Sequence, residues 1–513
     1  MGNAVDLSPI SENIRKVLEQ YQVSIATVDT FAGEVSVEWD LNSSTTPMGQ
    51  LAFFIEFMKS GDLLTPWVNE CPLELISNNA PSKLDVLGTV LLSVLSGHKR
   101  YAHVTAIRND GVTPQLLGMS KIVSEDSVRR NLKRIDEATG DIWMQEHLSK
   151  CYAPLLSIPW ILDMDTTVKT LYGKQEGAVV GYNPHKPGRP AHTYHTYSIA
   201  NLRLILDVEV QAGNHGSASH SAPGLWGILD KLPVGSKPAF IRGDCAFGID
   251  GIMCEAELRH QEYLFKLKQT KKVKTLIEQL MRINDWVDAG QGWEGIDSTV
   301  MLTGWKIERR VIVLRKRIST NIGVLSENPD TNQLEFNLGS INDKTIVYEY
   351  AVLITSLKDG IVTISQHYRD RADCENIFDE MKNQWGWGGF TTQDLHRCKL
   401  IARIVALIYN WWNIFVRLAE PDKHLEAITS RPLLLNSIGK QTNESGKTKI
   451  TICSMYGNIG KVKLLLGRIT SFFNELKSFA EQLTSEQRWH RILSKAVFKY
   501  LDGKQLAPPI CVT

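Results

Sequence analysis

Gln366-His-Tyr-Arg-Asp-Arg-Ala-Asp-Cys-Glu-Asn-Ile-Phe-Asp-Glu-Met-Lys382 is the stretch from which the rest of the sequence can be interpreted. It contains no Gly or Pro, and Ala372, Ile377 and Met381 alternate with charged residues, which predicts one continuous helix. Since a helix has 3.6 residues per turn, four chemically distinct side chains then lie close to one stripe. These are Tyr368, Arg371, Glu375 and Lys382.

This stripe carries one carboxylate among a phenol, a guanidinium and an ammonium group. A carboxylate among cations suits an acid that binds a metal ion while its neighbours hold phosphate groups. Ordinary Arg–Glu pairs on a solvated helix face would explain any single pair at least as well. The complete spacing is far rarer, because four fixed residues give on the order of 0.003 chance matches in a chain of this length.

The spacing Tyr-x2-Arg-x3-Glu-x6-Lys resembles the signature of bacterial insertion-sequence transposases of the DDE type, which move DNA by cut and paste. The resemblance implies that Glu375 is the third catalytic carboxylate of such an enzyme. It also implies that Tyr368, Arg371 and Lys382 contact DNA phosphates near the scissile bond. In the fold of this group, two further acids stand at neighbouring strand ends and face the acidic helix.

Two upstream strands contain the candidates for these acids. The apolar run Ile158–Val168 holds Asp163 and Asp165, which alternation places on one face. The family pattern is Asp followed by Ser or Thr, so the resemblance favours Asp165 and leaves Asp163 as a neighbouring acid. A second strand ends at Asp244, in a Phe-Ile-Arg-Gly-Asp context that resembles the family's second-aspartate motif. Taken alone, Asp244 would be explained as a turn or helix-capping residue.

The expected fold class is α/β, with a ribonuclease H-like catalytic core interrupted by a β-rich insertion. A mainly helical N-terminal domain and a helical C-terminal region flank it. The 513 residues allow three or four domains. We expect a DNA-binding or dimerisation domain over 1–150, the core over 151–268 and 361–420, the insertion over 269–360 and the C-terminal domain over 421–513.

Sequence patterns typical of helices support the helical parts of these domains. Lys399–Leu418 predicts a long apolar helix that covers the sheet. Thr484 and Gln487 have the spacing of a capping box, which predicts a helix over Gln487–Tyr500. Near the N-terminus, Ser124–Ile135 predicts an amphipathic helix preceded by a break.

Two further groups of residues are candidates for DNA contacts. The basic residues Arg129, Arg130 and Lys133 lie off the buried stripe of the helix at 124–135, as in the second helix of a helix-turn-helix. A solvated basic face explains them equally well. In the insertion, Trp293 lies among basic residues and could capture a flipped base, although a tryptophan in a β-rich region is more often part of the core.

Composition excludes several other classes of protein. The formal net charge is +1, so DNA binding requires a local basic patch. The eight cysteines form no C-x-x-C motif, which fits a reducing cytosol rather than a disulfide framework. We see neither a signal peptide nor a membrane span. Ser445–Thr448 lacks the first glycine of a phosphate loop, and His185, His192 and His195 lack further zinc ligands.

The resemblance therefore predicts a transposase that cleaves DNA with two Mg²⁺ ions, replaceable by Mn²⁺, at Asp165, Asp244 and Glu375. The expected partners are double-stranded DNA at terminal inverted repeats, target DNA and a second copy of the chain in a synaptic dimer. Its expected location is the bacterial cytoplasm, at the nucleoid. Two alternatives are a nuclease of the same fold that does not join ends and a non-catalytic DNA-binding descendant.

Overall fold

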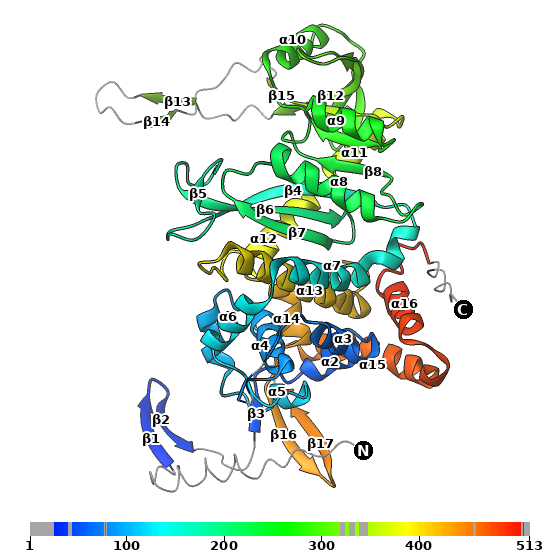
Figure 1. The fold of residues 1–513 in the computed structure, drawn as a ribbon. Coiled ribbons are helices and arrows are strands. Elements are labelled where there is room, and N and C mark those ends of the chain that lie inside the picture. The colour runs from blue at the N-terminus through cyan, green and yellow to red at the C-terminus, as the bar shows by residue number, and fades with distance from the viewer. Residues whose placement is uncertain are drawn as a thin grey trace.

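The computed structural model describes residues 25–38, 44–75, 77, 79–318, 324–327, 334–337, 347–454, 458–503 and 506. A mixed sheet of ten strands lies at its centre, with helices on both sides (Figure 1). The predicted α/β class is therefore confirmed.

Five neighbouring strands of this sheet carry the first part of the predicted core. Their order is β7 (Leu204–Ala212), β6 (Pro190–Ile199), β4 (Ile161–Thr170), β8 (Phe240–Gly243) and β9 (Tyr263–Lys266). Strand β6 is antiparallel to β4 and β7, whereas β8 is parallel to both β4 and β9. Because β4, β8 and β9 run in the same direction, residues at their carboxyl ends meet at one edge of the sheet.

The region predicted as a β-rich insertion continues this sheet. Strands β10 (Val287–Gly290), β11 (Trp293–Val300), β12 (Arg309–Ile318) and β15 (Val347–Thr355) follow one another in antiparallel pairs. Strand β15 pairs with β9, so no break in hydrogen bonding separates these strands from the core sheet. The consecutive apolar residues 311–314 of β12 and 351–354 of β15 are buried, as expected for strands covered on both faces. The domain boundaries themselves stay predictions.

Helix α13 (Leu395–Ala419) is the helix predicted to cover the sheet. It packs on β7 beside α7 (Glu137–Tyr152). Its Asn410 side chain donates to the Ile205 carbonyl and accepts the Ile205 N–H, at 2.8 and 2.9 Å. In the described part of the chain no strand pairs with the outer side of β7, and these bonds satisfy backbone groups there. The helix is long and apolar enough to span a membrane, but 94% of its most apolar window is buried, as in a core helix.

Helices from both ends of the chain pack on the far side of α13 (Figure 1). Phe54 of α2 (Leu51–Ser60) stacks edge-on against Trp412 of α13, and Phe57 lies 6.0 Å from the Trp489 ring of α16 (Ser485–Ala496). The predicted capping box forms, with Thr484 and Gln487 bonding each other's backbone N–H groups. The helix after it ends at Ala496, earlier than the predicted Tyr500. One apolar core thus joins residues from Met48 to Leu506.

The segment around Ser445 is a hairpin turn rather than a phosphate loop. It joins β16 (Gly439–Glu444) to β17 (Lys447–Ile452), and both central residues are left-handed, with φ of +51° at Ser445 and +73° at Gly446. Two positive φ angles are those of the type I′ turn that suits the twist of an antiparallel pair.

Candidate active site

The signature stretch is not the single helix that its sequence predicts. Helix α11 (Ile361–Arg369) and helix α12 (Ala372–Asn383) are separated by a turn at Asp370 and Arg371. In a continuous helix the Arg371 N–H would bond the carbonyl of His367. That carbonyl instead accepts a hydrogen bond from the guanidinium of Arg242, and the Arg371 N–H bonds the Tyr368 carbonyl at 3.1 Å. A side chain from a distant strand therefore interrupts the helix where it faces the sheet.

Asp165 and Asp244 come from neighbouring segments of the sheet, around the parallel strands β4 and β8. Asp163 of β4 is in register with Arg242 of β8. Two residues further along the chain come Asp165, which is still within β4, and Asp244, which follows the last residue of β8. Arg242 donates from Nε and Nη2 to the two carboxylate oxygens of Asp163, at 2.5 and 2.6 Å. This pair is almost inaccessible, with 0% and 2% of the side chains exposed. Asp163 is therefore engaged in a buried bridge that holds β4 and β8 in register.

Asp165 has a different environment from Asp163. Its Oδ1 accepts the N–H of Thr166 at 2.7 Å, and its Oδ2 accepts a hydrogen bond from Arg371. Burial raises the pKa of Asp165 to about 6; Arg371 opposes this shift, and the nearby Asp244 carboxylate adds to it. Asp165 and Asp244 are thus close enough for each charge to act on the other.

The signature cations surround the same carboxylate. Burial lowers the pKa of the Lys382 ammonium, and the charge of Asp165 opposes that shift. Burial likewise raises the pKa of the Tyr368 phenol, while Arg371 lowers it. Helices α11 and α12 therefore bring Tyr368, Arg371 and Lys382 into one electrostatic neighbourhood around Asp165.

Glu375 stands at the outer side of this neighbourhood. Its side chain is 72% exposed, and its Oε1 lies 3.6 Å from Nη1 of Arg371. The Arg371 guanidinium therefore lies between Asp165 and Glu375. Within the part of the chain that the structure describes, no three acidic, His or Cys side chains converge as a complete metal site. The donor set offers hard oxygen ligands at Asp165 and Asp244, which suit Mg²⁺, with the third acid one arginine away.

Each tryptophan of the β-rich region has a cation over its ring, and for Trp293 this is Lys316, whose Nζ lies 5.9 Å from the ring centroid. The ring centroids of Trp286 and Trp305 lie 4.0 and 5.1 Å from the guanidinium carbons of Arg315 and Arg309. Trp293 is half-buried and packs with Tyr368 on a small apolar cluster beneath α11. Trp293, the tryptophan predicted to capture a flipped base, thus lies on the sheet face that α11 covers.

The predicted basic helix near the N-terminus forms as α6 (Glu125–Arg134). Arg129 bonds Glu125 and Asp126 of its own helix, at 3.1 and 2.7 Å, and Lys133 lies 3.4 Å from Asp394. Arg130 is exposed. The helix before α6 is α5 (Thr113–Leu116), which has only four residues, so the helix-turn-helix stays a prediction.

Sequence reasoning missed two buried basic residues that hold the site together. Arg242 joins β4, β8 and α11, as described above. Lys169 of β4 is buried and donates to the carbonyl of Gly389, in the loop that follows α12. Each is a charged residue within an apolar strand, which was the available signal, but the sequence does not reveal the partner of either.

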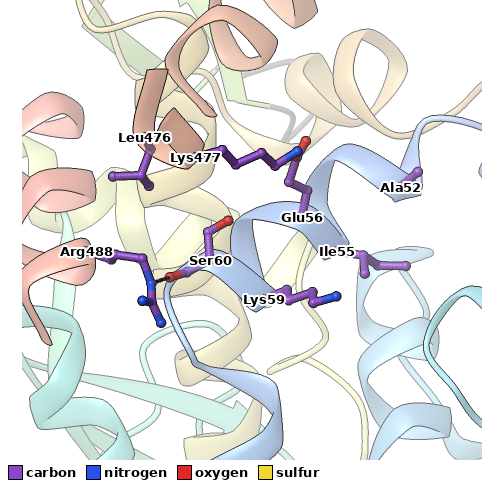
Figure 2. A pocket seen from close by; sticks show the side chains of 8 residues that line it. All are labelled: Ala52, Ile55, Glu56, Lys59, Ser60, Leu476, Lys477 and Arg488. Carbon is purple, nitrogen blue, oxygen red and sulfur yellow. Dashed lines mark hydrogen bonds and ion pairs between the residues drawn. The ribbon is translucent and has the colours of Figure 1, made fainter. Parts of the chain in front are cut away.

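A cavity of about 470 Å³ lies elsewhere, where α2, α15 (Ile459–Ser478) and the start of α16 meet (Figure 2). Its only carboxylate, Glu56, pairs with Lys477. It therefore lacks a pair of acids like Asp165 and Asp244.

One carboxylate within β4 and one just after the adjacent parallel strand β8, beside cations from the signature helices, define a candidate site for metal-dependent phosphoryl transfer. The family model for the transposase DDE domain, group 1, matches residues 81–457, and the chain belongs to this family. The predicted membership of the DDE transposases is thereby confirmed.

Comparison with individual proteins adds little to this assignment. No curated protein matches the chain. Among solved structures, the chain is similar to a piggyBac transposase determined by cryo-electron microscopy as a synaptic complex with hairpin DNA. The identity is 10% and the TM-score 0.36, over 89% of this chain and 88% of that one.

Proposed function

We propose that this protein cleaves the ends of a mobile DNA element and joins them to target DNA, using a ribonuclease H-like core. The main support is the position of Asp165 and Asp244, each two residues beyond the paired Asp163 and Arg242 of parallel strands, beside Arg371 and Lys382. The strand order β7-β6-β4-β8-β9, with β6 antiparallel to both neighbours, supports the ribonuclease H-like assignment.

In this proposal the three acids serve as metal ligands and the signature cations bind the DNA backbone. Asp165 and Asp244 would hold divalent ions, with Glu375 as the third acid. When bound, two Mg²⁺ ions, replaceable by Mn²⁺, would activate the attacking oxygen and stabilise the leaving oxygen. Lys382 and Arg371 hold phosphate oxygens next to the scissile bond, and Tyr368 orients the strand.

The remaining steps follow the transposase group. The first reaction is hydrolysis at the element's terminus, which frees a 3′-OH. Attack of this 3′-OH on the opposite strand closes a hairpin, and Trp293 captures the base that is flipped out of the stack. Reopening of the hairpin allows strand transfer. A second copy of the chain binds the other terminus in the synaptic complex, and α6 contacts the inverted repeat. A reaction on chromosomal DNA places the protein at the nucleoid in the bacterial cytoplasm.

The deciding experiment uses a plasmid that carries the DNA flanking the gene, including any short inverted repeats. We expect Mg²⁺-dependent nicks at the repeats and, with a target plasmid added, joined products bounded by a short target duplication. Nicking without joining would point to a nuclease. Binding without nicking, under conditions that keep the protein folded, would point to a non-catalytic DNA-binding descendant.

A further inference from the structure

The guanidinium of Arg371 is buried but makes few hydrogen bonds. Its side chain is 7% exposed. Of its five possible N–H donors, one on Nη2 bonds Asp165, while Nε is buried without a hydrogen-bond partner among the described residues. Arg242, by contrast, donates from all three of its nitrogens. Arg371 is therefore held mainly by charge and not by a saturated set of bonds.

The position of Arg371 coincides with the place where a metal ion would approach Asp165. The Oδ1 atom of Asp165 already accepts a backbone N–H from Thr166, so Oδ2 is the oxygen available to a cation. Arg371 occupies this oxygen and also faces Glu375. A guanidinium and a divalent ion at the same oxygen would repel each other.

We propose that Arg371 is the resident cation of the acid site, holding Asp165 in the metal-free protein and leaving it when a divalent ion binds. Arg371 then becomes available to a DNA phosphate. The inference rests on the proposed function and adds to it an order of events: the arginine exchanges between a carboxylate and the substrate. Its release also ends the ion pair with Glu375, one helix turn further on.

The test is Mn²⁺ binding to the full-length, DNA-free protein, measured by electron paramagnetic resonance. Removing a competing cation should tighten binding, so we expect Arg371→Ala to bind Mn²⁺ roughly five- to tenfold more tightly than the wild type. Lys382→Ala is the matched control, since it removes one positive charge near Asp165 that does not hydrogen-bond to it. We expect a gain of only about twofold in Lys382→Ala, because its ammonium acts on Asp165 through charge alone.

An unchanged or weakened Mn²⁺ affinity in Arg371→Ala would overturn the proposal, as would an equal gain in Lys382→Ala. If circular dichroism shows that Arg371→Ala does not fold, Arg371→Lys replaces it. A lysine ammonium cannot face Asp165 and Glu375 with separate nitrogens, so we expect a gain of roughly two- to threefold, and no gain would overturn the proposal. Absence of Mn²⁺ binding in the wild type would contradict the metal-dependent function itself, which separates the two failures.

Discussion

Two aspartates of strand β4, two residues apart, each pair with an arginine from another element. The two pairs differ in their hydrogen bonds and in their exposure to solvent. Asp163 and Arg242 are joined by two hydrogen bonds of 2.5 and 2.6 Å, and neither side chain is more than 2% exposed. Asp165 and Arg371 share one hydrogen bond, and their side chains are 15% and 7% exposed. We call Asp163 and Arg242 the inner pair, and Asp165 and Arg371 the outer pair. A second carboxylate, Asp244, acts on the outer pair.

The difference shows how one strand provides both a fixed structure and a reactive site. In the inner pair the two charges neutralise each other, and Arg242 connects β4, β8 and α11. Exchange of Arg242 for another cation is therefore unfavourable. The outer pair is crowded by a further negative charge and lies next to solvent, which favours exchange of the arginine for another cation.

The largest expected effect concerns the acids of the outer site. Asp165→Asn, Asp244→Asn and Glu375→Gln should each reduce cleavage of the element's ends by on the order of 1,000-fold or more, because each removes a charge that holds the reaction's metal ions. Binding to the ends, measured by gel shift, should stay close to that of the wild type. Retained cleavage in any one variant would remove that residue from the site.

The next effect concerns the inner pair. Arg242→Ala should lower the free energy of unfolding by about 3–5 kcal/mol, because it leaves the Asp163 carboxylate buried without its partner. Arg371→Ala should cost less, roughly 1–2 kcal/mol, since Asp165 can take up a proton near neutral pH. Urea denaturation measures both. Equal losses would mean that the two pairs do not differ in the way described.

The third prediction concerns pH and applies only to the outer pair. The pKa of Asp165 in the folded protein is raised to about 6, so the carboxyl is protonated below this pH and ionised above it. Protons should therefore compete with Mn²⁺, weakening its binding by up to about tenfold for each pH unit below 6. Isothermal titration calorimetry between pH 5 and 8 checks this. A flat profile across pH 6 would contradict the raised pKa.

The smallest expected effect concerns Lys382. Lys382→Ala should weaken binding to DNA ends and reduce the slope of log affinity against log salt by about 1, since one phosphate contact is lost. Lys495→Ala, in the last turn of α16, is a control for general surface charge. A similar change in both variants would show that the effect is not specific to the signature helix.

Residues with a local pattern could be placed well from the sequence. The strand predicted at 158–168 is β4 at Ile161–Thr170, and the helix predicted at 124–135 is α6 at Glu125–Arg134. The capping box at Thr484 also forms as predicted. In each case neighbours within a few positions determine the backbone, so the relevant information is contiguous.

The errors arose where a distant residue intervenes. The signature stretch has strong helix formers throughout, yet it breaks at Arg371 because Arg242, more than 100 residues earlier, takes the carbonyl of His367. The sequence also does not reveal that the strands after β9 extend the central sheet, because strand neighbours depend on pairing and not on local propensity.

The amino-acid sequence by itself determined which residues could do chemistry here: the spacing from Tyr368 to Lys382, and aspartates at the ends of apolar strands. Only the tertiary structure decided which aspartate is enclosed by Arg242 and which meets Asp244 and Arg371. Asp163 and Asp165 share a strand face and a side-chain type, so their difference lies entirely in what the neighbouring strand and the α11–α12 turn place beside them. Burial and charge are properties of that surrounding, and they set the pKa and the exchangeability of each carboxylate.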